Sequence, residues 1–124
     1  MLETKNAFSS FSVNDLQQAK RFYGQTLGLK VSESPQGLEM HPGETSVFVY
    51  PKPNHQPASF TVLNFLVDDI EATVDELKQK GVSFEQYKGE IKTNEKGIHR
   101  GDGPTIAWFK DPAGNILSVL QTDH

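Results

Sequence analysis

The sequence contains no cysteine, which excludes disulfide bonds, thiolate metal sites and a cysteine nucleophile. It has no apolar run long enough to cross a bilayer, and its first eight residues, MLETKNAF, lack the core of a signal peptide. Lysine and arginine are scattered, and the formal net charge is -4, which disfavours nucleic-acid binding. We therefore expect a cytoplasmic protein with no nucleic-acid partner and no membrane partner.

The aromatic residues that are present can build a core. The 124 residues include 8 Phe, 3 Tyr and 1 Trp, which offset a lean hydrophobic content of 35%. A chain of this length can bury a core without covalent cross-links. We expect one domain over residues 1–124.

Two parts of the sequence repeat one pattern. VNDL at residues 13–16 aligns with VDDI at residues 67–70, and an amphipathic helix is expected after each. Asn14 and Asp68 are the expected N-caps. Gln17 and Glu71 follow them at the capping-box spacing. Ile70, Val74 and Leu77 share one helix face, and Gly81 is expected to end that helix.

Strand patterns surround both helices. The expected strands are residues 7–13, 29–33, 37–41 and 45–50 in the first copy, and 59–67, 82–87, 105–109 and 116–120 in the second. The sequence therefore predicts an α+β fold of two βαβββ modules, at about residues 5–51 and 59–122. The proline-rich residues 51–58 are the expected linker, and residues 88–104 are a long polar loop.

Three motifs resemble one known superfamily. VNDLQQAKRFYGQTLGLKV, VDDIEATVDELKQKGV and FKDPAGN are similar to motifs of the vicinal oxygen chelate proteins, which include glyoxalase I, bleomycin resistance proteins and extradiol dioxygenases. The resemblance covers nearly the whole chain. It implies mixed, curved sheets around a central cavity and a homodimer.

The resemblance also implies where a metal ion would be bound. Counted from the motifs, the four ligand positions are Phe8, Val62, Ser118 and a residue within 47–49, for which Phe48 is chosen. Divalent metals in proteins need imidazole, carboxylate or thiolate donors, which these side chains do not supply. We therefore expect no metal ion and no other cofactor, which removes the Lewis-acid chemistry of the metal-using relatives.

Strand alternation predicts which side chains line the cavity. The candidate ligand-binding residues on the strands are Phe8, Ser10, Phe48, Tyr50, Val62, Asn64, Trp108 and Ser118. Such a mixture of apolar walls and a few polar groups is typical of a small-molecule pocket. The alternatives are that Phe8 and Phe48 fill space, that the serines bond neighbouring carbonyls or water, and that Trp108 is a core residue. Asn64 needs partners in so apolar a strand, from a ligand or from the protein itself.

The polar loop offers a further candidate group. Arg100 lies beside His99 and Asp102, and it could meet an anionic ligand there. The alternative is a solvated loop. A metal site built from His41, His99 and Asp102 is conceivable, but no spacing supports it. His55 in the linker and the terminal His124 are expected in solvent.

Three functions follow from these residues. The first is a metal-independent protein that sequesters or carries a partly apolar small molecule, which the apolar residues at the ligand positions favour. The second is a glyoxalase-like lyase or related metal-dependent enzyme with atypical ligands, or one whose acid and base groups lie on the loop 88–104. The third is an interaction module with a vestigial pocket. No catalytic residue can be assigned by spacing.

Overall fold

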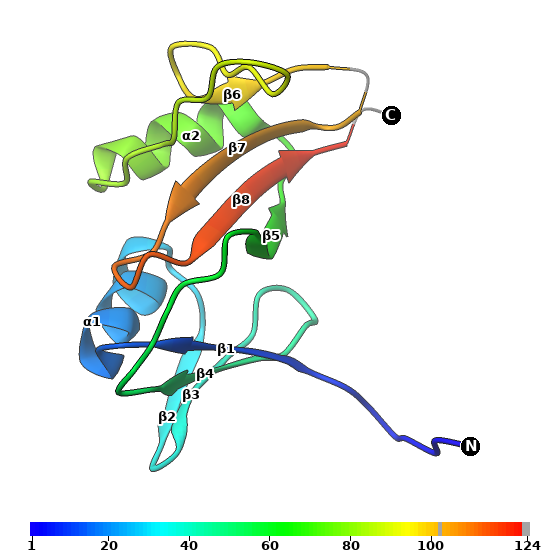
Figure 1. The fold of residues 1–124 in the computed structure, drawn as a ribbon, viewed down its shortest axis with the longest axis vertical. Helices are drawn as coiled ribbons and strands as arrows, with labels where there is room; N and C mark the ends of the chain where they lie inside the picture. The colour runs from blue at the N-terminus through cyan, green and yellow to red at the C-terminus, as the bar shows by residue number, and fades with distance from the viewer. Residues whose placement is uncertain (102, 123–124) are drawn as a thin grey trace. The chain divides into compact units, whose positions relative to one another are not determined.

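A computed structural model describes residues 1–101 and 103–122 of the chain. The chain divides into two compact units, unit 1 from Met1 to Gln56 and unit 2 from Pro57 onward, which are described separately here. Each unit holds one four-stranded mixed sheet and one α-helix (Figure 1). The predicted α+β class with two βαβββ modules is therefore confirmed.

Unit 1 begins with a strand, a helix and three further strands. Its elements are β1 (Ser9–Val13), α1 (Leu16–Arg21), the π-helical turn η1 (Phe22–Thr26), β2 (Val31–Ser34), β3 (Gly37–Met40) and β4 (Val47–Pro51). The strand order is β1-β4-β3-β2, with β1 parallel to β4 and the other pairs antiparallel. Because β1 and β4 are parallel, the chain must cross back between them, and α1 begins that crossover.

The core of unit 1 lies on the α1 side of its sheet. Phe11 and Val13 are buried on β1, whereas the alternate residue Ser10 is exposed, as period-two alternation requires. α1 packs against β3 and β4. Tyr23 is fully buried and contacts Phe11 through tilted rings whose centroids are 6.0 Å apart. We call the opposite side of this sheet, which carries Ser10, the open face of unit 1.

Unit 2 repeats the arrangement. Its elements are β5 (Thr61–Leu66), α2 (Ile70–Gln79), β6 (Ile98–His99), β7 (Thr105–Lys110) and β8 (Ile116–Gln121), in the sheet order β5-β8-β7-β6. The predicted apolar face of α2 is buried, and the helix packs against β7 and β8. Gly81 has φ +95° and lies in a Schellman motif, in which the Val82 N–H bonds the Leu77 carbonyl, so it ends α2 as predicted.

The predicted N-caps are wrong by one residue. Asp15 and Asp69 have extended backbone and accept hydrogen bonds from the amides three residues later, so they cap α1 and α2. Asn14 and Asp68 therefore lie outside the helices. Glu71 is then the second helical residue, whereas a capping box needs a glutamate at the third. Its carboxylate is therefore available for contacts outside the helix.

The predicted strand 82–87 is also wrong in extent. Only an isolated bridge joins Phe84 to Phe109, and the Glu85 N–H bonds the Trp108 carbonyl. The same edge of β7 is then taken by β6, which lies inside the predicted loop 88–104. One edge strand is thus interrupted by residues 86–97, an excursion that periodicity cannot reveal because the two halves are far apart in sequence.

The linker is tied to unit 1 near its end. The Nδ1 atom of His55 lies 2.7 Å from the hydroxyl oxygen of Ser12, and His55 is half-buried. The prediction that His55 is solvated is therefore wrong. His124, also expected in solvent, lies outside the described residues. Within residues 1–101 and 103–122, no helix combines the length and apolarity that crossing a membrane requires.

Gly37 offers a test of the packing between β3 and β4. A Cβ atom placed there would overlap the Val49 carbonyl oxygen, far inside van der Waals contact. We expect Gly37→Ala to lower the free energy of unfolding by about 3 kcal/mol, because the strand pair must shift. Chemical denaturation followed by circular dichroism measures this.

Gly43 is the matched control. It has φ +63°, but a methyl group on its Cα would have no other atom within 4 Å. Gly43→Ala should therefore cost only roughly 1 kcal/mol, the strain of a left-handed residue. Equal losses for both variants would contradict the proposed clash.

Candidate functional site

The open face of unit 1 carries aromatic side chains from β4. Ser10 on β1 pairs in register with Phe48 on β4, and Ser12 pairs with Tyr50, so these four share one face. The rings of Phe48 and Tyr50 are stacked with centroids 6.4 Å apart and planes 17° from parallel. The predicted residues Ser10, Phe48 and Tyr50 are therefore brought together.

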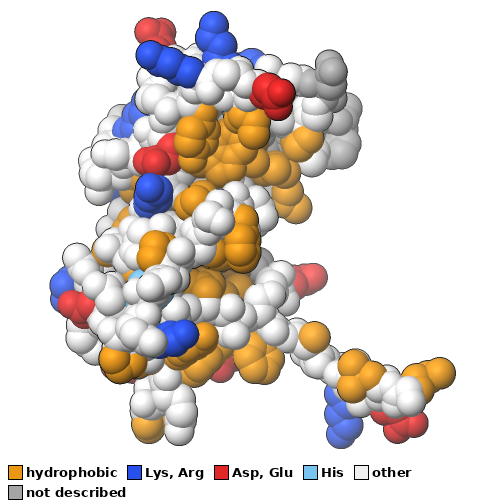
Figure 2. Space-filling model, in the orientation of Figure 1, with side chains coloured by type: hydrophobic (Ala, Val, Ile, Leu, Met, Phe, Trp, Pro, Cys, Tyr) orange, Lys and Arg blue, Asp and Glu red, His pale blue; other side chains and the backbone are white. Residues whose placement is uncertain are grey.

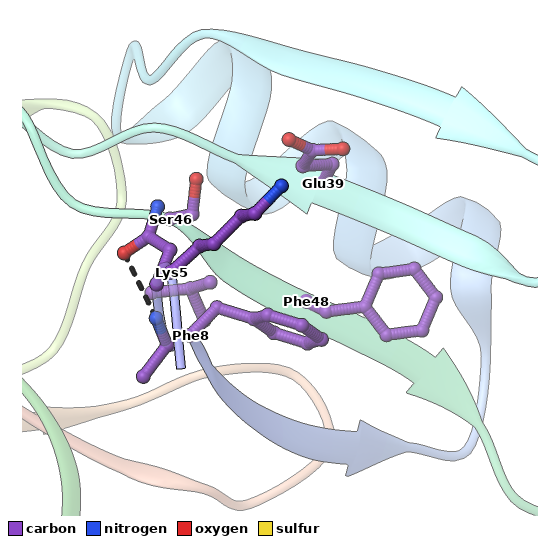
Figure 3. A pocket seen from close by; sticks show the side chains of 8 residues that line it. Lys5, Phe8, Glu39, Ser46 and Phe48 are labelled. Atoms are coloured by element: carbon purple, nitrogen blue, oxygen red, sulfur yellow. Dashed lines mark hydrogen bonds between the residues drawn. The ribbon is translucent and has the colours of Figure 1, made fainter. Parts of the chain in front are cut away.

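A hollow of about 460 Å³ opens on this unit, next to Phe48. Phe8 and Phe48 supply its apolar lining, while Lys5 and Glu39 bring one cation and one anion to it (Figure 3). Phe8 is 68% exposed, so the ring is not filling a closed core. Figure 3 also shows Ser46 at this hollow. The space can take a small molecule with an apolar body and a polar end.

A polar chain borders the hollow. His41 Nε2 lies 3.1 Å from a Glu39 carboxylate oxygen, and His41 Nδ1 lies 3.3 Å from the Ser46 hydroxyl oxygen. A serine–histidine–carboxylate order is the one that activates a nucleophile. The Glu39 side chain is 55% exposed, however, so water screens its charge and weakens any activation. We therefore interpret Glu39, His41 and Ser46 as a polar border of the hollow and not as a catalytic group. Sequence spacing could not predict this contact, because a loop separates His41 from Ser46.

One face of the unit 2 sheet is built around a pair of polar side chains. Asn64 on β5 and Trp108 on β7 both pair with Ser118 on β8, so the three lie across one face. The Ser118 side chain is fully buried, and its hydroxyl donates to the Asn64 side-chain oxygen at 2.5 Å. Within residues 1–101 and 103–122, nothing bonds the Asn64 amide nitrogen, which leaves two donors for a ligand.

Trp108 has aromatic neighbours on this face. Its ring centroid lies 5.3 Å from that of Tyr87 in an edge-to-face arrangement and 6.3 Å from that of His99. Burial, assisted by the Glu85 charge, raises the pKa of Tyr87, so its hydroxyl stays protonated at neutral pH. The His99 Nδ1 atom lies 2.9 Å from the Lys92 carbonyl oxygen. Sequence patterns missed Tyr87 and His99 as neighbours of Trp108 because the excursion 86–97 separates them.

Apolar side chains extend the same face. Leu66 is 75% exposed and pairs with Leu120, which in turn pairs with Ile106. Figure 2 shows hydrophobic side chains gathered over the part of unit 2 that holds β7 and β8. A contiguous exposed apolar face of this kind marks a binding surface more often than an accident of composition.

Two predicted site residues lie apart from this group. Val62 is half-buried at a β-bulge, where the register between β5 and β8 shifts between Thr61 and Leu63. Arg100 forms an ion pair with Glu71 at 2.9 Å. An anionic ligand at Arg100 would have to compete with that carboxylate. Asp102, the third member of the predicted loop group, lies outside the described residues.

The side chains at the four implied metal positions do not fit a divalent cation. The side chains of Phe8, Phe48 and Val62 have no atom that can ligate a metal ion. The Ser118 hydroxyl donates its hydrogen bond to Asn64. Among the residues that the structure describes, no group of three or more His, Asp or Glu side chains is placed to hold a metal ion. His41 and His99, the two described members of the other conceivable site, have the partners given above.

Paired βαβββ modules with these three motifs define a protein of the vicinal oxygen chelate type. Comparison with known families agrees: residues 8–119 match the Glyoxalase/Bleomycin resistance protein/Dioxygenase superfamily, and the chain belongs to it. The match covers both units, so both modules carry the family pattern.

Individual relatives are more distant. The chain is 25% identical over 125 residues to the protein YraH of Bacillus subtilis (strain 168), covering 88% of this chain and 91% of that one. The crystal structure of TnmS3, an antibiotic binding protein from Streptomyces sp. CB03234, has a TM-score of 0.68 and 23% identity, covering 98% and 100% of the two chains. The fosfomycin resistance protein FosX from Listeria monocytogenes has a TM-score of 0.72 and 11% identity, covering 98% and 96%. These likenesses establish the shared fold.

Proposed function

We propose that the protein binds a small, partly apolar molecule without using a metal ion. The observation that carries this proposal is the Ser118–Asn64 hydrogen bond beside Trp108. At the position where metal-using relatives would place a ligand, the serine holds Asn64 instead, and Asn64 lies on the same face as the Trp108 ring. An aromatic platform next to two hydrogen-bond donors suits a flat ligand that carries an acceptor oxygen.

Unit 1 offers a separate candidate surface for such a molecule. The hollow lined by Phe8 and Phe48 offers an apolar wall, and Lys5 and Glu39 offer charges at its border. The exposed Phe8 ring and the half-buried Phe48 ring lose unfavourable contact with water when a ligand covers them. The likeness to an antibiotic binding protein and to a fosfomycin resistance protein supports screening antibiotics first.

Two titrations test the proposal. Calorimetry with Ni²⁺, Mn²⁺ and Zn²⁺ should show no tight, stoichiometric binding, because the four positions lack donors. A library of aromatic antibiotics should contain compounds that quench or shift the fluorescence of Trp108, the single tryptophan. Tight binding of one metal ion per chain would overturn the metal-independent function and favour the glyoxalase-like enzyme.

The oligomeric state belongs to the same proposal. A homodimer, implied by the family resemblance, would cover part of the exposed apolar surface that Phe8 and Leu66 represent. Light scattering coupled to gel filtration measures the mass directly. A monomeric mass at high concentration would overturn the dimer and leave the binding proposal untouched.

A further inference from the structure

A cluster of four charged side chains fastens α2 to the segment around β6. The two carboxylate oxygens of Glu71 accept from Lys96 at 3.1 Å and from Arg100 at 2.9 Å, one on either side of β6. Asp75, one turn further along α2, also binds Lys96, at 3.3 Å. The hydrogen bonds that Lys96 donates, first to Glu71 and then to Asp75, raise the pKa of Lys96, so the lysine is charged at neutral pH. We name these four side chains the Glu71 cluster.

The segment held by the Glu71 cluster carries two aromatic neighbours of Trp108. Tyr87 lies near the start of the excursion 86–97, and His99 follows its end. The excursion is bonded to itself: the Tyr87 N–H donates to the Thr93 hydroxyl oxygen at 2.8 Å. His99 is joined to the Lys92 carbonyl in the same way. Displacing the segment would therefore move the Tyr87 ring relative to Trp108 directly. It would also disturb the His99 side chain through the bond to Lys92, while the His99 backbone stays paired with Ile106 on β7.

The equivalent position in unit 1 makes a comparable connection without an excursion. Gln17, which aligns with Glu71 in the repeat, donates to Glu33 on the edge strand β2 at 3.0 Å. Lys20 binds the other oxygen of Glu33 at 2.9 Å. In both units the second helical position thus ties the helix to the edge of its sheet. Only in unit 2 does the tied edge bear aromatic residues of the candidate site.

We propose that Glu71 is a positioning residue for ligand binding: it holds Lys96 and Arg100, and so keeps Tyr87 and His99 against the Trp108 ring. This inference rests on the proposed function and names a residue outside the ligand surface that controls it. Each exposed ion pair alone contributes little, but two pairs share one carboxylate, and both weaken as salt screens them. Affinity for an uncharged ligand should therefore fall with ionic strength. Hydrophobic contact alone would give no change or a rise.

The test uses the full chain and the aromatic dye N-phenyl-1-naphthylamine. Because this dye is uncharged, any effect of salt on its binding must come from the protein. We expect Glu71→Gln to increase quenching of Trp108 by acrylamide, since the two covering rings move. We also expect it to weaken dye binding roughly three- to tenfold at about 0.02 M salt. At about 0.5 M salt the native protein should approach the variant, because screening has removed the same interactions.

Glu76→Gln is the matched control. Glu76 lies on the same helix and pairs only with Lys80, at 3.5 Å, among the described residues, so this variant removes the same charge and one ion pair without touching the segment 86–97. It should behave as the native protein. Lys96→Gln should reproduce part of the effect of Glu71→Gln, because it removes the Lys96–Glu71 contact but leaves the Arg100–Glu71 ion pair in place. The double variant should show less than the sum of the two single effects, because both changes remove that shared contact.

The outcomes separate the two proposals. Unchanged acrylamide quenching in Glu71→Gln, or equal effects of Glu71→Gln and Glu76→Gln, would overturn the positioning role. If the dye and the antibiotic library fail to bind the native protein, the proposed function fails, while the quenching comparison still decides whether Glu71 positions the rings.

Discussion

Replacing Asp111 by alanine is expected to lower the free energy of unfolding by about 3 kcal/mol, because it leaves buried donors without an acceptor. The side chain is buried, with 4% exposure, in the turn between β7 and β8. One oxygen accepts from the backbone N–H groups of Ala113 and Asn115, at 2.9 and 2.8 Å. The other accepts from the Asn115 side-chain amide at 2.9 Å. Alanine removes every one of these acceptors together.

Urea denaturation followed by Trp108 fluorescence measures the effect in unit 2, which contains the single tryptophan. The matched control is Asp68→Ala, because Asp68 is exposed and lies outside α2. Its loss should change stability by less than about 0.5 kcal/mol. If both variants unfold at the same urea concentration as the native protein, the turn network does not stabilise the fold as we argue.

The same turn shows what the sequence could and could not predict. The residues DPAGN, which lie between the expected strands 105–109 and 116–120, predict a turn, since proline, glycine and asparagine favour one. The motif also located the family. The sequence does not show that Asp111 accepts the hydrogen bonds of the whole turn, because this depends on the three-dimensional geometry. Asp111 and Asn115 are polar yet buried, and only the structure shows that they satisfy one another.

Periodicity predicted the parts of the site that lie on continuous strands. Alternation along residues 116–120 placed Ser118 on the face opposite the buried Leu117 and Val119, and alternation along residues 59–67 placed Asn64 among the cavity-lining residues. The structure adds that the two are direct neighbours. Periodicity failed where the backbone departs from regularity. The bulge at Val62 shifts the register, and the excursion 86–97 lies between Tyr87 and His99 in the sequence, although both rings contact Trp108. A pattern of period two cannot be continued through either feature.

The capping error has a similar physical cause. Aspartate and asparagine are both good N-caps, and each helix is preceded by two such residues in succession. Composition cannot choose between them. The structure chooses the second, which moves Glu71 from a capping role to the Glu71 cluster. One residue of register therefore separates a local helix signal from a contact with the segment 86–97.

Replacing Trp108 by alanine is the change with the largest expected effect on binding. We expect the affinity for N-phenyl-1-naphthylamine to fall at least about tenfold, because the variant removes the central aromatic face of unit 2. The remaining neighbours, Tyr87 and His99, approach Trp108 itself and make no platform without it. The dye's own fluorescence reports binding, so the loss of tryptophan emission does not impair the measurement.

Two further variants separate the ring from its bulk and from its indole N–H. Trp108→Leu keeps an apolar side chain but no aromatic face, so it should bind almost as weakly as Trp108→Ala. Trp108→Phe keeps a ring without the N–H donor and should recover most of the affinity for the dye, which stacks on an aromatic face. Circular dichroism melting confirms that each variant is folded. A folded Trp108→Ala with native affinity would show that the ligand surface lies elsewhere, and would direct attention to the hollow beside Phe8 and Phe48 in unit 1.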